Sequence, residues 1–280
     1  MNFMNLLLKQ MICCIFALMF CACKDSQLLF SDNGTTVTGA KSNTLDSCVI
    51  PEGVTKIGKN AFKNYRSLQN AEIAESVTVI EESAFDNCWS LIAIKIPDHV
   101  TEIGNRAFAD CKDLTHVTIG NSVTDMGKDT FASCQNLNTV IIGERVNKID
   151  DRVFYRCQEL SVIEIPDSVR EIGNEAFFLC VALERVRIGN GVTRIGDRAF
   201  YDNRKLTALT IGDSVTHIGK EAFAECVELV SVVLPESVQN VGNGAFANCI
   251  RLSRITVPAR FTAGDVKKWG IPAGCRIIRR

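Results

Sequence analysis

Residues 192–214 read VTRIGDRAFYDNRKLTALTIGDS, and this pattern returns every 23 residues along the chain. A leucine follows each phenylalanine of the pattern six residues later, from Leu68 to Leu252. A fixed period of this length is typical of a solenoid, in which each repeat buries its apolar side against the next. The nine phenylalanines are Phe62, Phe85, Phe108, Phe131, Phe154, Phe177, Phe200, Phe223 and Phe246.

Two parts of the repeat predict two walls of the coil. The segment from Leu206 to Ile211 has the pattern L-x-x-L-x-L of a strand, with Leu209 and Ile211 pointing inward. The apolar residues around Phe200 are three apart, which predicts a short helical or 3-10 turn on the other wall. We therefore expect a curved α/β repeat solenoid of the right-handed leucine-rich-repeat type, with a parallel sheet on its concave face and these turns on its convex face.

Cysteine stands three residues after the phenylalanine in seven of the nine repeats. Successive coils would hold these thiols parallel at about the strand spacing, which suits neither a disulfide nor a zinc site. We expect free thiols packed in the core, and no bound metal. The seven are Cys88, Cys111, Cys134, Cys157, Cys180, Cys226 and Cys249, and Tyr65 and Asn203 fill the other two slots.

Glycine stands four residues before the phenylalanine in seven repeats, with Glu81 and Asp150 in the other two. These exceptions indicate a tight turn that does not require a positive φ at this slot.

The first residues differ from the repeats and predict export. Lys9 precedes an apolar run over residues 11–22, too short to span a membrane but long enough for a signal peptide. Ala22 before Cys23 resembles the cleavage site of bacterial lipoproteins. We expect a signal peptide over 1–22 and lipidation of Cys23, which places the protein at the outer membrane. An ordinary cleaved signal and a retained anchor are the alternatives.

The remaining boundaries follow from the repeat register. Residues 23–44 are rich in Ser, Asn, Thr and Gly, which predicts a flexible lipid-anchored tether. A single solenoid domain then covers 45–280, with a half-coil cap over 45–53. At the other end Trp269 replaces the phenylalanine, and residues 261–280 form a degenerate C-terminal cap.

The unit I-G-x-x-A-F-x-x-C-x-x-L-x-x-V-x-I-P-x-S resembles the BspA-like leucine-rich repeat proteins of bacterial surfaces. The resemblance covers roughly Leu45 to Ile278 and implies a surface protein that adheres to host or other extracellular proteins. No invariant adhesion motif can be transferred from that family to this sequence.

The outward slots of the strand, two and four residues after each leucine, vary between repeats while the core slots do not. In the middle of the chain they form an apolar spot bordered by charge, as a protein-binding patch would. The alternative is a solvated sheet face with β-branched residues chosen for strand propensity. The candidate binding residues are Ile141, Val162, Glu164, Arg185 and Arg187.

Other functions find little support. The formal charge of −1 does not favour nucleic acid, and the three histidines occupy unrelated slots. No catalytic constellation, phosphate loop or cofactor motif is evident, so we expect neither an enzyme nor a cofactor. We predict a monomeric surface protein-interaction module. A glycan-binding accessory protein is an alternative, although none of the outward strand slots holds an aromatic residue. A passive structural or antigenic coat protein is another.

Overall fold

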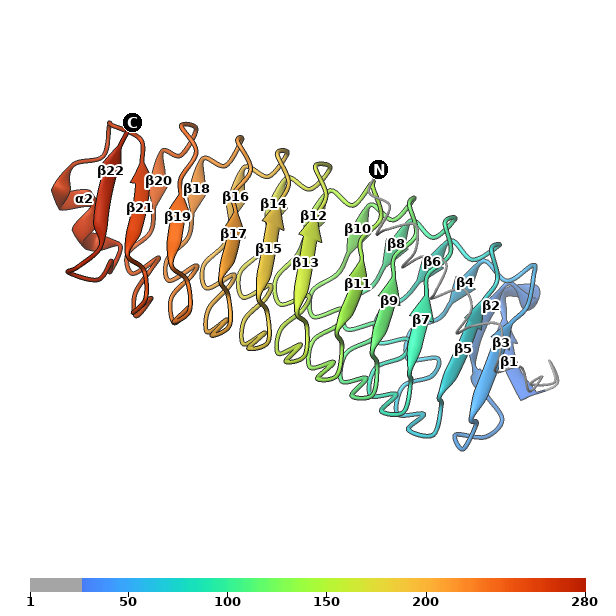
Figure 1. The fold of residues 1–280 in the computed structure, drawn as a ribbon. Helices are drawn as coiled ribbons and strands as arrows, with labels where there is room; N and C mark the ends of the chain where they lie inside the picture. The colour runs from blue at the N-terminus through green and yellow to red at the C-terminus, as the bar shows by residue number, and fades with distance from the viewer. Residues whose placement is uncertain (1–26) are drawn as a thin grey trace, which may run out of the picture.

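A computed structural model describes residues 27–280 and shows an elongated stack of coils running from one end of the chain to the other (Figure 1). Each coil contributes one longer strand to one wall and a two-residue strand to another. Strands of successive coils pair in parallel, with partners 23 residues apart, as for Val162 and Arg185. The predicted repeat solenoid with a parallel sheet is confirmed. The predictions for residues 1–22 and Cys23 lie outside the described residues.

The strands of the stack fall into two series. The long-strand face comprises β3 (Ser47–Ile50), β5 (Asn70–Ile73), β7 (Ala93–Lys95), β9 (His116–Thr118), β11 (Thr139–Ile141), β13 (Val162–Ile165), β15 (Arg185–Ile188), β17 (Ala208–Thr210), β19 (Ser231–Val233) and β21 (Arg254–Val257). The short strands are β4 (Lys56–Ile57), β6 (Val79–Ile80), β8 (Glu102–Ile103), β10 (Asp125–Met126), β12 (Lys148–Ile149), β14 (Glu171–Ile172), β16 (Arg194–Ile195), β18 (His217–Ile218) and β20 (Asn240–Val241).

Overlapping turns around each phenylalanine form the remaining wall, called the turn wall below. In the first repeat Ala61, Lys63 and Tyr65 donate their N–H groups to carbonyls three residues back, as in a 3-10 turn. Asn60, Phe62 and Asn64 alternate with them and donate instead to the next coil, and Asn60 and Asn64 have positive φ. The N–H of every phenylalanine from Phe62 to Phe246 makes such a bond, at 2.7–2.9 Å. The turn wall is therefore hydrogen-bonded without interruption.

Two ladders of side chains fill the core behind this wall. The nine phenylalanines are fully buried, and successive rings stack with centroids 4.9–5.6 Å apart. The seven thiols are buried and free, and each donates to the carbonyl of the phenylalanine in the preceding coil, as Cys88 does to Phe62 at 3.0 Å. This agrees with the predicted packing of free thiols.

The two exceptions in the thiol ladder differ in their surroundings. Tyr65 places its hydroxyl 3.0 Å from both the N–H and the carbonyl oxygen of Ala40, and so ties the N-terminal segment to the first coil. Asn203 is fully buried, and neither end of its amide has a hydrogen-bond partner. Nothing in the structure explains why an amide stands there.

The N-terminal cap begins earlier than the composition indicates. The chain forms a hairpin of β1 (Leu28–Ser31), the 3-10 turn η2 (Asp32–Gly34) and β2 (Thr36–Ala40), and β2 pairs in parallel with β4. The prediction of a flexible tether is therefore wrong for these residues. Leu28 and Val37 are buried against the first coil, so the polar residues around them form the turn and the exposed positions of the hairpin. Leu45, Cys48 and Ile50 of the expected half-coil are also buried.

At the C-terminal end, a short helix closes the stack. Helix α2 (Ala263–Lys268) begins at Thr262, whose side chain forms a reciprocal capping box with Asp265. Trp269 follows in the phenylalanine slot, is buried, and accepts the N–H bond of Phe246 at its carbonyl. The last strand, β22 (Arg276–Arg279), pairs in parallel with β21.

The long-strand face, unlike the turn wall, is interrupted. Its strands form three separate sheets, which end between β11 and β13 and between β17 and β19. At both places the residue after the strand changes from glycine to proline, from Gly143 to Pro166 and from Gly212 to Pro235. A Cβ on Gly143 or Gly212 would lie 2.1–2.2 Å from a carbonyl oxygen of the preceding coil. Proline carries that Cβ, and both interruptions fall where a proline coil follows a glycine coil.

Hydrogen bonds between the turns that follow the strands also run through three successive coils and then stop. Asp98 accepts the N–H of Asn121, and Asn121 accepts the N–H of Glu144. An equivalent series joins Asp167, Asn190 and Asp213, and neither series continues into the next proline coil. Pro97 and Pro166 therefore each open a block of 69 residues, and Pro235 follows the second block.

The short strands are interrupted once, between β10 and β12. The next coil carries Asp150 in its glycine slot. A Cβ on the equivalent Gly127 or Gly173 would lie 2.4–2.5 Å from backbone of the preceding coil, so glycine is needed here for close approach, not for a positive φ. The Asp150 side chain keeps its coil from closing on β10. Glu81 occupies the same slot without an interruption, and its carboxylate accepts the N–H of Lys59.

Candidate functional site

The predicted binding residues lie on adjacent strands of the long-strand face. The register places Val162 beside Arg185 and Glu164 beside Arg187, and all four side chains are exposed. Ile141 is only half-buried and lies on β11, across the interruption from β13. Arg187 comes no nearer than 3.9 Å to a carboxylate, that of Asp167, which is too long for a strong pair. Ile141, Val162 and Glu164 thus line the interruption between the two sheets, and Arg185 and Arg187 lie one strand further away, on β15.

A second exposed apolar spot, not expected from the sequence, lies at the other interruption. Val230 and Val233 are 43% and 52% exposed, and Leu209 in the preceding coil is only partly buried. Val140 is partly exposed in the same way at the first interruption. The change from glycine to proline after the strand is the sequence signal that could have located both spots.

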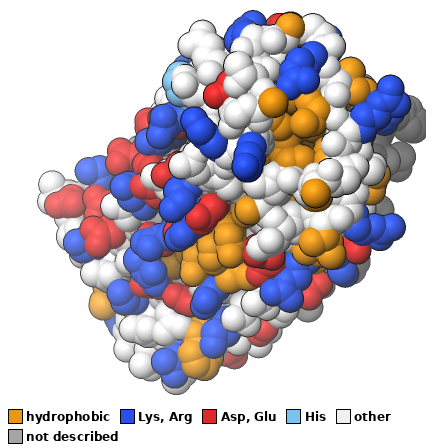
Figure 2. Space-filling model, turned by 90° about the vertical axis from the view of Figure 1, so that its left-hand side faces the viewer, with side chains coloured by type: hydrophobic (Ala, Val, Ile, Leu, Met, Phe, Trp, Pro, Cys, Tyr) orange, Lys and Arg blue, Asp and Glu red, His pale blue; other side chains and the backbone are white. Residues whose placement is uncertain are grey.

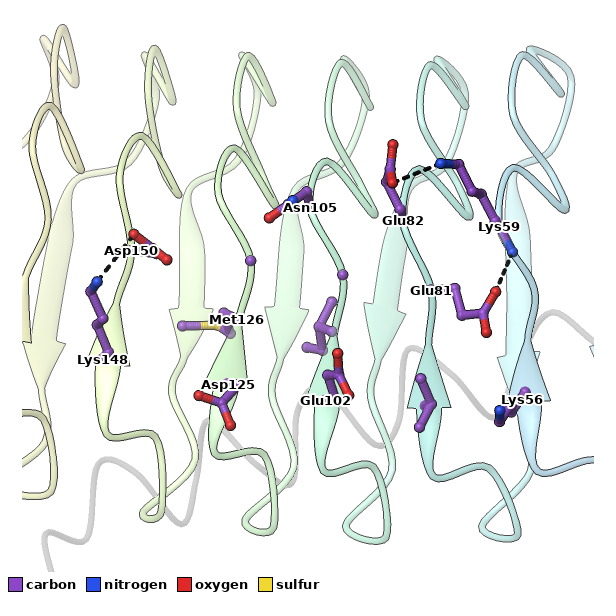
Figure 3. Close-up of a pocket in the computed structure, with 14 residues that line it drawn as sticks. Lys56, Lys59, Glu81, Glu82, Glu102, Asn105, Asp125, Met126, Lys148 and Asp150 are labelled. Carbon is purple, nitrogen blue, oxygen red and sulfur yellow. Dashed lines mark hydrogen bonds and ion pairs between the residues drawn. The ribbon is translucent and has the colours of Figure 1, made fainter.

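A shallow groove of about 560 Å³ crosses the short strands (Figure 3). Lys56, Glu102, Asp125 and Lys148 come from successive parts of this wall, and the glycines at 104 and 127 form part of its floor. Lys148 pairs with Asp150 at 3.4 Å, and Lys59 pairs with Glu82 at 2.9 Å, so the ends of the groove are electrostatically compensated. The exposed charges give no general acid and base pair held in a closed site.

The histidines are not brought together. His99 lies 3.4 Å from Glu75. His116, the first residue of β9, contacts the preceding Thr115, and burial lowers the pKa of His116. Within residues 27–280 no group of three or more His, Cys, Asp or Glu side chains is placed to hold a metal ion. In the same range, every helix is too short or too polar to cross a membrane.

Aromatic side chains do reach the surface, but on the turn wall. Tyr155, Phe178 and Tyr201 each follow a core phenylalanine by one residue, are partly exposed, and stack with centroids 5.0–5.2 Å apart. Trp89 lies on the same wall, partly exposed. The sequence-based prediction considered only the strand slots, so it did not include these four residues.

Charges of both signs are mixed over the surface seen from the C-terminal end, with apolar side chains gathered in separate patches between them (Figure 2). The mixture of charges agrees with a net charge of −1, so binding would depend on local features of the surface.

Stacked coils with parallel strands, a phenylalanine spine and caps at both ends define a leucine-rich-repeat solenoid, a class of binding scaffold. A family model described as the BspA type leucine rich repeat region matches residues 40–161 and 147–265. The chain belongs to this BspA-type family, as the repeat unit predicts. A search of curated proteins found no match.

One solved structure shows the same architecture, and others are more distantly similar. A leucine-rich repeat protein of T. pallidum is 26% identical, with a TM-score of 0.54 over 90% of this chain and 97% of that one. A leucine-rich repeat protein of Bacteroides ovatus is 20% identical, with a TM-score of 0.47 over 93% and 100% of the two chains. A leucine-rich cell surface protein of Faecalibacterium prausnitzii is 23% identical, with a TM-score of 0.40 over 93% and 94%. The family and fold are those of a protein-interaction module.

Proposed function

We propose that this protein is an exported surface module that adheres to host or other extracellular proteins through its long-strand face. The exposed apolar side chains at the first sheet interruption, next to arginines without a strong ion pair, carry this proposal. Val162 is 39% exposed and lies directly beside Arg185, which makes no ion pair within residues 27–280. An apolar centre with arginine at its rim is the composition that protein interfaces favour.

The proposal extends to the N-terminus. Membership of the BspA-type family supports a surface location, and lipidation of Cys23 after removal of residues 1–22 would anchor the protein to the outer membrane. Metabolic labelling with a palmitate analogue, compared with the Cys23→Ala variant, tests the anchor separately from binding. Label on the wild-type protein and none on the variant is the expected result.

A protein array tests the binding face. Residues 24–280 would be passed over matrix proteins, serum proteins and glycans, beside a variant carrying Ile141→Asp and Arg187→Glu. A control with Thr118→Asp and Lys95→Glu alters equivalent outward slots on β9 and β7. Saturable binding to a protein that only the first variant loses is the expected result, with circular dichroism showing that both variants are folded.

Other results would point elsewhere. Binding that survives both variants would remove the site from the long-strand face. No binding to any protein would favour a passive coat protein. Binding to neutral glycans that the Ile141 and Arg187 changes abolish would favour the glycan-binding alternative, which the lack of aromatic residues in the outward strand slots disfavours.

A further inference from the structure

Trp89 on the turn wall lies between two cationic side chains. Arg66 occupies the equivalent slot in the preceding coil and Lys112 the equivalent slot in the following one. The Arg66 guanidinium carbon and the Lys112 Nζ each lie 4.1 Å from the centre of the indole ring. Because the three residues belong to successive coils, the two cations cover opposite faces of the ring. Cation–π attraction therefore holds both charges in place without neutralising them.

Neither cation has an anionic partner. Arg66 and Lys112 form no ion pair with any of residues 27–280, although charged side chains surround them. Arg204 stands in the same slot four coils beyond Lys112, and there Asp202 binds the guanidinium at 2.7 and 3.0 Å. The slot can therefore accommodate a partner carboxylate. The residues equivalent to Asp202 in the coils around Trp89 are Asn64, Asn87 and Asp110, and Asp110 binds Arg106 instead of Lys112.

Trp89 and Lys112 line a hollow of about 340 Å³, and its wall is held in place. Asp86 has a side chain only 4% exposed, and its carboxylate binds Lys63 at 3.0 Å and Arg106 at 3.1 Å. Arg106 also binds Asp110 at 2.9 Å. A buried carboxylate fixes these long side chains, so Lys63 and Arg106 present their remaining N–H donors to the hollow in a defined arrangement.

The lining is polar throughout. Asn87 donates to Asn64 at 2.6 Å, and both amides border the hollow beside Trp89. Three cationic side chains, Lys63, Arg106 and Lys112, line the hollow against the carboxylates of Asp86 and Asp110, and Arg66 adds a fourth positive charge over the Trp89 ring. It therefore offers positive charge for an anionic group, together with amide and carboxylate groups that can bind hydroxyls.

We propose that this hollow is a second binding site, for an acidic saccharide unit carrying a carboxylate or a sulfate. The anionic group would lie beside Lys112 in the hollow, with Arg66 adding positive charge from the other face of Trp89, and the sugar hydroxyls would bind the amides and the carboxylates. An acidic peptide segment offers few hydroxyl donors for Asp86 and Asp110, which favours the saccharide. The cations cover both faces of Trp89, so recognition rests on charge and hydrogen bonds and not on stacking of the sugar on the ring. This site is on a different wall from the proposed adhesion face and does not depend on it.

The test uses residues 24–280 with immobilised heparin for the sulfate and alginate for the carboxylate. The variant is Arg66→Gln with Lys112→Gln, and the matched control is Arg204→Gln, which removes a compensated charge from the same slot. We expect salt-sensitive binding of wild type and control to at least one polymer, weakened about tenfold or more in the double variant. Whichever polymer binds identifies the acidic group.

Three outcomes would overturn the site. These are binding to neither polymer, equal losses in the double variant and the Arg204 control, or binding to poly-L-glutamate as tight as to the polysaccharides. Unchanged circular dichroism melting curves for all three proteins show that a loss is not unfolding. A loss of protein adhesion on the long-strand face would leave this result unchanged, because the two sets of substitutions lie on different walls.

Discussion

The turn wall and the long-strand face belong to the same coils, yet only the turn wall is continuous. On the turn wall every phenylalanine N–H from Phe62 to Phe246 bonds the next coil. On the long-strand face the sheet stops after β11 and after β17, and apolar side chains become exposed there. The phenylalanine slot is the same in every repeat from Phe62 to Phe246, and the coils stay hydrogen-bonded there. The slot after the strand holds glycine in some coils and proline in others, and the sheet stops where proline follows glycine. A spine that is the same in every repeat therefore coexists with sheet interruptions on the face whose outward residues differ between repeats.

The thiol ladder should make the turn wall sensitive to alkali. Burial raises the pKa of Cys180 and Cys249 from the ordinary value of 9.0 to about 12. Above pH 9 the unfolded chain loses thiol protons that the folded chain keeps, so stability is complete below pH 9 and falls as the pH rises toward 12. Each such thiol lowers the free energy of unfolding by up to about 1.4 kcal/mol per pH unit in this range.

Urea unfolding at pH 8, 9 and 10 under reducing conditions measures this effect, since the midpoint should fall steeply above pH 9. Cys180→Ala should make the fall shallower by the share of one thiol. An unchanged midpoint between pH 8 and 10 would show that the thiols are not shielded from ionisation.

Truncation of the spine should cost more than truncation at an interruption. Phe177→Ala removes a fully buried ring stacked on both sides and should cost about 3–5 kcal/mol. Leu209→Ala, at a half-buried position beside the second interruption, should cost no more than about 2 kcal/mol, because part of that side chain already meets solvent. Urea unfolding of both variants gives the comparison, and equal costs would contradict the difference between the walls.

The unpartnered amide in the thiol ladder can be replaced. Asn203→Cys replaces an unpartnered buried amide with the thiol found in the neighbouring coils, and should stabilise the protein by about 1–3 kcal/mol. The reverse exchange, Cys180→Asn, should destabilise it by a similar amount. Thermal unfolding of the two variants measures the pair, and no gain for Asn203→Cys would mean that the amide is satisfied in solution.

The interruptions should also be visible to hydrogen exchange. Ile96 and Ile119 donate their N–H groups to the next coil at 2.8 and 2.9 Å, whereas the equivalent Ile142 and Ile211 have no such bond. We expect faster amide exchange at Ile142 and Ile211, measured by NMR. Pro235→Gly should let the following coil approach and slow the exchange of Ile211. Equal protection at all four positions would show that the sheet closes in solution.

Features that each repeat dictates by itself could be predicted from the sequence. The core slots of Phe177 and Cys180 follow from the period, and so do the strand register and the exposure of Val162 and Arg185. The sheet interruptions depend on how a proline coil meets the glycine coil before it, which is a property of pairs of repeats. The hairpin at residues 28–40 was missed because its few buried residues, such as Val37, are dispersed among polar ones. Trp89 was missed because its slot lies outside the strand.

The block of 69 residues has a consequence for how such a chain can lengthen or shorten. Removal of residues 166–234 would join Ile165 to Pro235, which recreates the junction now present at Pro166. The phenylalanine period would be kept, because Phe246 would take the place of Phe177. Removal of a single coil would instead change the order of glycine and proline along the stack. Recombination between whole blocks would thus yield shorter or longer proteins whose junctions already occur in this chain, with both caps unchanged.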